Sequence, residues 1–69
     1  MQESYFVRGE IFGEFIFLKF PSFETAKTFC KLCSSHFICK LHVEWTNQTT
    51  DFIGREFQTY IIWEDGDEK

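Results

Sequence analysis

Residues Ser22 to Trp45, SFETAKTFCKLCSSHFICKLHVEW, change their hydrophobic period halfway along. Up to Cys33, apolar residues recur at spacings of three and four, which is the period of a helix that buries one side. From Phe37 to Trp45, every second residue is apolar on one side, which is the pattern of a half-buried strand. The change predicts a helix followed directly by a strand, and therefore an α+β domain.

Both ends of this helix carry local signals. Pro21 stops the preceding segment, and the Ser22 hydroxyl can accept from the free N–H groups of the first turn. Glu24 then suits the positive end of the helix dipole. We expect the helix to begin at Ser22 and to end at Ser34-Ser35, after about three turns.

The segment before the helix, Tyr5 to Phe20, reads YFVRGEIFGEFIFLKF and is rich in aromatic and β-branched residues, as strands are. Two interpretations remain open. The chain turns into a hairpin at Gly9-Glu10 or near Gly13, or one long strand bends at the glycines. The glycines favour the hairpin.

The segment after the helix contains a second alternating run, Phe57 to Glu64, which we expect to pair antiparallel with the Phe37 to Trp45 strand across the polar stretch 46–54. Trp45 and Trp63 are expected on the core face. The fold class is therefore α+β: a small antiparallel sheet of three to four strands with one helix packed on one face, in the order ββαββ or βαββ.

The chain length predicts a single domain, residues 1–69, in which 20% of the residues are aromatic. The formal charge is −4, and it is unevenly distributed. Residues 1–63 hold seven acids and six bases, whereas residues 64–69 hold four acids and one lysine. We therefore expect a nearly neutral body with an acidic C-terminal tail.

This composition argues against several environments and ligands. A nucleic-acid binder needs clustered Lys and Arg, and no such cluster occurs, so direct nucleic-acid binding is not expected. No apolar run approaches the roughly 20 residues of a membrane span, and residues 1–4 do not resemble a secretion signal. We expect a cytoplasmic protein whose three cysteines form no disulfide.

Five potential metal ligands are spaced three residues apart: Cys30, Cys33, His36, Cys39 and His42. On regular structure they cannot all converge, because Cys39 and His42 are an odd number of residues apart on a strand and point to opposite faces. The favoured interpretation is that the cysteines are small buried hydrophobes, with His36 at the negative end of the helix and no cofactor. The alternative is a small zinc domain held by Cys30, Cys33, His36 and Cys39.

Catalysis is not expected. A reactive Cys-x-x-Cys pair needs a helix N-terminus to lower the thiol pKa, and here the pair lies near the C-terminal end. Glu10 and Glu14 are the carboxylates that come nearest to an acid–base pair. Such residues more often lie on the solvated face of a strand. The chain is therefore expected not to be an enzyme.

The last strand offers the best candidate for a binding surface. Strict alternation puts Tyr60 and Ile62 on the face opposite Trp63, where no helix covers the sheet. The neighbours expected there are Ile38 and Phe6 or Phe12. If this strand is an edge, its backbone is unprotected up to the acidic segment. The expected partner or dimer contact comprises Tyr60, Ile62, Glu64, Asp65, Asp67 and Glu68.

These features predict a non-catalytic protein-binding module in which an aromatic surface docks and the acids steer the encounter. Small acidic domains of this type are used by viruses and mobile elements as inhibitors of host enzymes or defence complexes. A nucleic-acid-handling enzyme or complex is one such protein partner. A homodimeric structural or antitoxin-like subunit is a further alternative.

Overall fold

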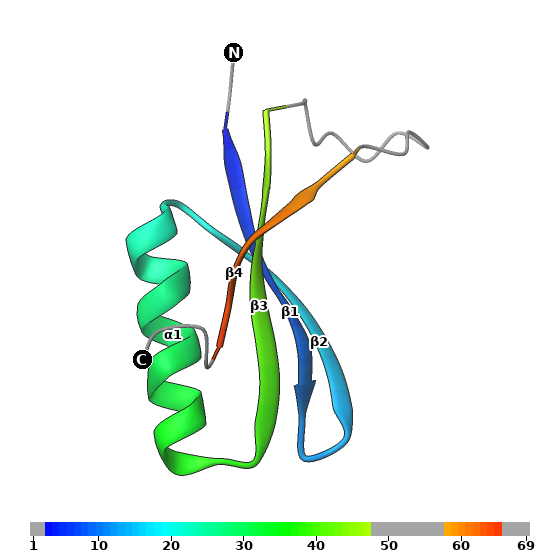
Figure 1. Ribbon diagram of the computed structural model, residues 1–69, viewed down its shortest axis with the longest axis vertical. Helices are drawn as coiled ribbons and strands as arrows, with labels where there is room; N and C mark the ends of the chain where they lie inside the picture. The colour runs from blue at the N-terminus through cyan, green and yellow to red at the C-terminus, as the bar shows by residue number, and fades with distance from the viewer. Residues whose placement is uncertain (1–2, 48–57, 66–69) are drawn as a thin grey trace.

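The computed structural model describes residues 3–47 and 58–65. Its elements are β1 (Ser4–Ile11), β2 (Glu14–Phe20), α1 (Phe23–His36), β3 (Cys39–Thr46) and β4 (Tyr60–Glu64). All strand pairs are antiparallel in the order β2-β1-β3-β4, and α1 covers one face of the sheet (Figure 1). The α+β prediction is confirmed, and of its two versions the order is ββαββ.

The hairpin turns at Phe12-Gly13, where both residues have positive φ, 52° and 80°. This pair of angles belongs to the two-residue turns that match the natural strand twist. Gly9 lies within β1 instead, opposite Leu41 of β3, and a Cβ atom there would overlap the carbonyl oxygen of Lys40. One glycine therefore makes the turn, while the other allows two backbones to approach closely.

The helix begins as expected and ends later than expected. The Ser22 hydroxyl accepts from the N–H of Thr25 at 3.2 Å, as an N-cap does. The expected end at Ser34-Ser35 is wrong, because α1 continues to His36. The hydroxyls of Ser34 and Ser35 donate to carbonyl oxygens one turn back, so these residues fit the last helical turn instead of breaking it.

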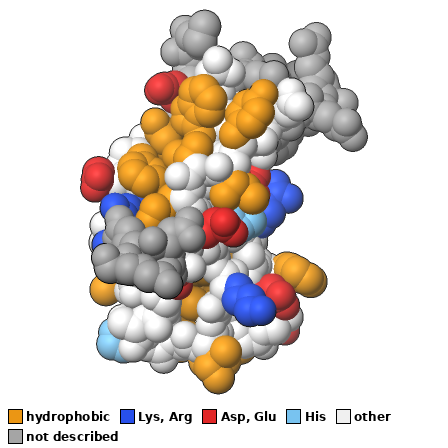
Figure 2. Space-filling model, in the orientation of Figure 1, with side chains coloured by type: hydrophobic (Ala, Val, Ile, Leu, Met, Phe, Trp, Pro, Cys, Tyr) orange, Lys and Arg blue, Asp and Glu red, His pale blue; other side chains and the backbone are white. Residues whose placement is uncertain are grey.

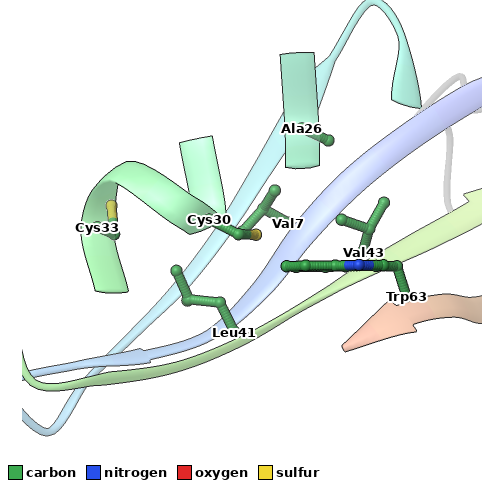
Figure 3. Close-up of a cluster of buried hydrophobic side chains, with 7 residues drawn as sticks. All are labelled: Val7, Ala26, Cys30, Cys33, Leu41, Val43 and Trp63. Carbon is green, nitrogen blue, oxygen red and sulfur yellow. The ribbon is translucent and has the colours of Figure 1, made fainter. Parts of the chain in front are cut away.

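The core lies between α1 and the sheet (Figure 3). Its members come from the helix and from three strands: Val7, Ala26, Cys30, Cys33, Leu41, Val43 and Trp63. The expected burial of Cys30 and Cys33 is confirmed. Among the described residues, no helix is both long and apolar enough to span a membrane.

The sheet face away from α1 also buries side chains. Phe6 is only 1% exposed and stacks on Phe17, with the ring centroids 4.9 Å apart. Glu44, which lies opposite Phe6 in the register, is 5% exposed. The expectation that Phe6 joins an open apolar surface is therefore wrong.

Candidate functional site

β4 forms one edge of the sheet, and its register with β3 shifts between Val43 and Glu44. Trp63 lies opposite Val43, but Tyr60 lies opposite Trp45, so one extra residue is accommodated in β4 between these pairs. Val43 and Trp45 are two residues apart on β3 and share the helix side, which places Tyr60 on that side too. The expectation that Tyr60 lies on the sheet face opposite to that of Trp63 is wrong, because it assumed unbroken alternation.

Four aromatic residues meet on this helix side, and we call them the aromatic strip: Tyr5, Phe23, Trp45 and Tyr60. The rings of Trp45 and Tyr60 have centroids 6.2 Å apart, and those of Tyr5 and Phe23 are 6.5 Å apart. Tyr5 pairs with Trp45 across β1 and β3, which joins the two ring pairs. Tyr60 is 53% exposed, and the other three are half-buried.

The strip exists because the helix is shorter than the sheet. The 14 residues of α1 span about 21 Å, whereas the eight residues of β3 span about 26 Å. α1 begins at Phe23, and the upper parts of β1 and β3 run past that end (Figure 1). Hydrophobic side chains gather over this part of the face in Figure 2. Trp45 therefore lies on the expected core face but remains partly exposed beyond the helix.

The other residues of the predicted contact do not gather around Tyr60. Glu64 lies opposite His42, and the Asp65 N–H donates to the Leu41 carbonyl at 3.0 Å. These acids are at the far end of β4, about 13 Å from Tyr60 along an extended strand. Ile62 is 44% exposed within the shifted part of β4. Asp67 and Glu68 lie outside the described residues.

A buried carboxylate on the opposite face fixes the strand end that carries Tyr60. Glu44 accepts from Arg8 Nε at 2.8 Å, pairs with His42 Nε2 at 2.6 Å and accepts from the Thr59 hydroxyl at 2.5 Å. Burial alone raises the pKa of the Glu44 carboxyl, but the hydrogen bonds from Thr59 and His42 and the charge of Arg8 outweigh it, and they hold the pKa below its usual range. Because Thr59 directly precedes β4, this Glu44 cluster ties Tyr60 to β3.

Sequence reasoning missed the Glu44 cluster. The alternating pattern of β3 places Glu44 on the side away from the core, which predicts a solvated residue. Arg8 and Thr59 are distant in the sequence, and only the strand order brings them to Glu44. No local signal marks such a site.

The cysteines face the core, and the histidines lie elsewhere. Cys30 and Cys33 are buried and Cys39 is half-buried, while His36 is exposed and His42 bonds Glu44 on the other face. Cys39 and His42 therefore lie on opposite faces, as their spacing predicts. Burial raises the pKa of the Cys30 thiol to about 12, with Asp65 and the other two cysteines adding to the effect. Across residues 3–47 and 58–65, no three His, Cys, Asp or Glu side chains are grouped to hold a metal ion.

A second apolar surface lies at the opposite end of the sheet, and we call it the hairpin tip: Phe12, Phe37 and Ile38. Phe12 is 63% exposed and meets Phe37 edge-on with centroids 5.4 Å apart. Its N–H donates to the Ile38 carbonyl at 3.0 Å, which anchors the turn to the connection between α1 and β3. Ile38, expected beside Tyr60, instead belongs to this end.

Comparison with known proteins adds no assignment, since no family model, curated protein or solved structure matches this chain.

Proposed function

We propose that this chain is a non-catalytic protein-binding module that docks its aromatic strip on a partner protein. The observation that carries the proposal is Tyr60, which is 53% exposed yet held against Trp45 on a part of the sheet that α1 does not cover. Aromatic side chains supply large contact areas with few rotatable bonds, and Tyr and Trp are enriched among the residues that dominate interface energies.

The Glu44 cluster supports this role, because it holds the strip in place from behind. Thr59 is fixed by its hydrogen bond to Glu44, and Tyr60 follows it in the chain. A surface that is ordered before binding loses less conformational entropy when the partner arrives. The strip is thus prepared for docking.

The acids indicate the chemistry of the partner. Glu64 is the last residue of the edge strand that begins at Tyr60, and Asp65, Asp67 and Glu68 follow it in the sequence. A complementary partner presents an apolar pocket for the aromatic rings and basic side chains beside it. Proteins that handle nucleic acids carry basic surfaces of this kind, and a domain that covers such a surface inhibits the partner. Inhibition of a host enzyme or defence complex is the form of this function that we propose.

The chemistry of individual groups supports a non-catalytic role. The thiol of Cys30, with a pKa of about 12, is protonated at neutral pH and is a poor nucleophile. Glu44 already accepts from three side chains, so it is committed to structure. Glu10 lies opposite Phe15 and Glu14 opposite Ile11, which puts these two carboxylates on opposite faces of the sheet.

The test compares surface variants in capture of a partner and then in binding to the purified partner. Tyr60→Ala should weaken binding by more than about fivefold, since an interface aromatic contributes over 1 kcal/mol. Leu32→Ala is the matched control, because Leu32 is 57% exposed on α1 and lies outside the strip. Both variants should unfold in urea like the parent.

Charge gives a second arm of the same test. Neutralising the acids of residues 64–69 should slow association more than it speeds dissociation, and the slowing should vanish at high salt. If Tyr60→Ala and the neutralised tail bind like the parent while Phe12→Ala does not, the contact lies at the hairpin tip and the proposal is wrong.

A further inference from the structure

β2 forms the other edge of the sheet, and it is the more regular of the two edge strands. Its seven residues, Glu14–Phe20, pair with β1 in an unbroken register, whereas β4 has five residues and a register shift. Natural edges usually carry proline, a bulge or charges that block pairing with another chain. β2 has no proline, and its charged residues are Glu14 at the first position and Lys19. Its backbone is therefore suited to strand addition.

Apolar side chains flank this edge on both faces. Phe15 is 84% exposed and Phe17 is 42% exposed on the face away from α1, while Leu18 is 41% exposed on the helix side. An edge that is apolar on both faces offers side-chain contacts above and below any strand that joins it. Phe15 in particular makes almost no use of its area within its own chain.

We propose that β2 pairs antiparallel with β2 of a second copy of this chain, about a two-fold axis that passes through Phe17. In this register all seven residues of β2 are paired, and any shift leaves residues at both ends unpaired. Phe17 meets its own equivalent, and Phe15 meets Lys19 of the second copy. Sequence EFIFLKF is self-complementary in this arrangement because no like charges are opposed.

The backbone groups fit the same register. In a hairpin with a two-residue turn, the closing pair, here Ile11 and Glu14, exchanges both hydrogen bonds. Bonding then alternates along the strand, so Phe15 and Phe17 direct their N–H and C=O groups away from β1. A two-fold axis at Phe17 brings these outward groups opposite outward groups of the second copy, as an antiparallel ladder requires.

The charges favour a second copy over an unrelated strand. Arg8 already lies over the Phe17 ring, with its guanidinium carbon 4.4 Å from the centroid. Lys19 would lie beside Phe15 of the second copy in a similar cation–π contact, twice per dimer. The two Arg8 side chains are separated by three strand spacings, about 14 Å, which exceeds the Debye length at physiological salt. Repulsion between them is therefore screened.

Dimerisation would change how the aromatic strip is displayed. A two-fold axis normal to the sheet keeps both helices on one face, and it leaves each β4 at an outer edge. Both strips then face the same way, which allows one dimer to engage a repeated partner at two points. The dimer inference does not depend on the proposed function, because β2 and the strip share no residue.

The experiment is sedimentation equilibrium of the full chain from about 1 μM to 1 mM, the range that covers weak association. The test variants are Phe15→Lys and Phe15→Glu at this highly exposed position. Lys at 15 faces Lys19 of the second copy, whereas Glu at 15 faces it as an opposite charge. Within one chain the order is reversed. Position 15 lies opposite Glu10, so Phe15→Lys gains an opposite-charge pair there and Phe15→Glu a like-charge pair.

We expect a concentration-dependent dimer for the parent and for Phe15→Glu, and a dissociation constant about thirtyfold higher for Phe15→Lys than for Phe15→Glu. Misfolding cannot produce this order, since the Lys variant has the better pairing with Glu10 inside its own hairpin. A parent that stays monomeric at 1 mM overturns the proposal, and so does equal weakening by both variants. A monomeric parent whose capture of another protein is lost in Phe15→Lys would assign the β2 edge to that protein instead.

Discussion

Replacement of Glu44 by Gln tests the buried cluster that holds the end of β4. The carboxylate accepts from Arg8, His42 and Thr59, but a glutamine amide has one acceptor oxygen and an NH₂ group that would face at least one of these donors. Hydrogen bonds to charged groups contribute about 1.5–3 kcal/mol each. Because the Arg8 side chain is half exposed, we assign its ion pair with Glu44 only the small contribution to stability of a surface salt bridge.

The net cost combines these contributions with the relief of no longer burying a charge. Two part-buried hydrogen bonds are weakened or lost, and the desolvation cost of the carboxylate is removed, so we expect Glu44→Gln to lower the free energy of unfolding by about 2–3 kcal/mol at pH 7. A domain of this size has only about 3–5 kcal/mol from its core. The variant should therefore be close to its unfolding midpoint in mild denaturant.

The pH dependence follows from the direction of the pKa shift. The pKa of Glu44 is lower in the folded protein than in the unfolded chain, so its stabilising effect is complete above the unfolded value of about 4.3 and is lost as the pH falls through the folded value. The difference in stability between the parent and Glu44→Gln should be largest at pH 7, and it should shrink as the pH falls below the unfolded pKa of Glu44.

Urea unfolding followed by tryptophan fluorescence measures both stabilities, since Trp45 and Trp63 lie in different environments. Glu10→Gln is the control, because Glu10 is an acid on the same face of the sheet whose side chain is not part of the Glu44 cluster, and it should change stability by less than about 0.5 kcal/mol. A difference between the parent and Glu44→Gln that is the same at pH 7 and pH 3 would refute the reasoning.

Two further predictions concern the glycines and the cysteines. Gly9→Ala should cost more than about 2 kcal/mol or prevent folding, because its Cβ meets the Lys40 carbonyl, while Gly13→Ala should cost only about 1 kcal/mol for its positive φ; equal costs in urea would contradict the assignment. Cys30→Ala and Cys33→Ala should each cost about 1–2 kcal/mol through lost packing, and in the folded protein a thiol reagent should modify half-buried Cys39 first. Modification of both Cys30 and Cys33 within seconds would show that they are not buried.

The parts of the fold that could be predicted are those that local chemistry determines. Ser22 caps α1 by a bond to a residue three positions away, and the change of period after α1 needs only neighbouring residues. The position of the turn does not follow from the sequence, because either glycine could form a turn and because Phe12 is an unusual residue at positive φ. Whether Gly9 forms a turn or allows the backbones of β1 and β3 to approach closely depends on β3, which is about 30 residues away.

The candidate site could be predicted only in part, and the register shift in β4 is the physical reason. Its cause is the pairing with β3, since nothing in the sequence YIIWE distinguishes a shifted strand from a regular one. One extra residue moves Tyr60 to the other face, so a correct strand assignment still gave the wrong surface. The exposure of Tyr60 was predictable from the sequence, but the residues that lie beside it were not.

The register shift also explains how the Tyr60 end of β4 can make contacts on both faces of the sheet. Glu44 and Trp45 are adjacent on β3 and point to opposite faces, so β4 must supply a polar donor for one and an aromatic partner for the other. Thr59 and Tyr60 provide these in the same order, while Trp63 still reaches the core opposite Val43. Unbroken alternation from Trp63 would direct Tyr60 toward the Glu44 side and would remove the Trp45–Tyr60 ring contact. The extra residue in β4 therefore lets one short strand close the core and present the aromatic strip.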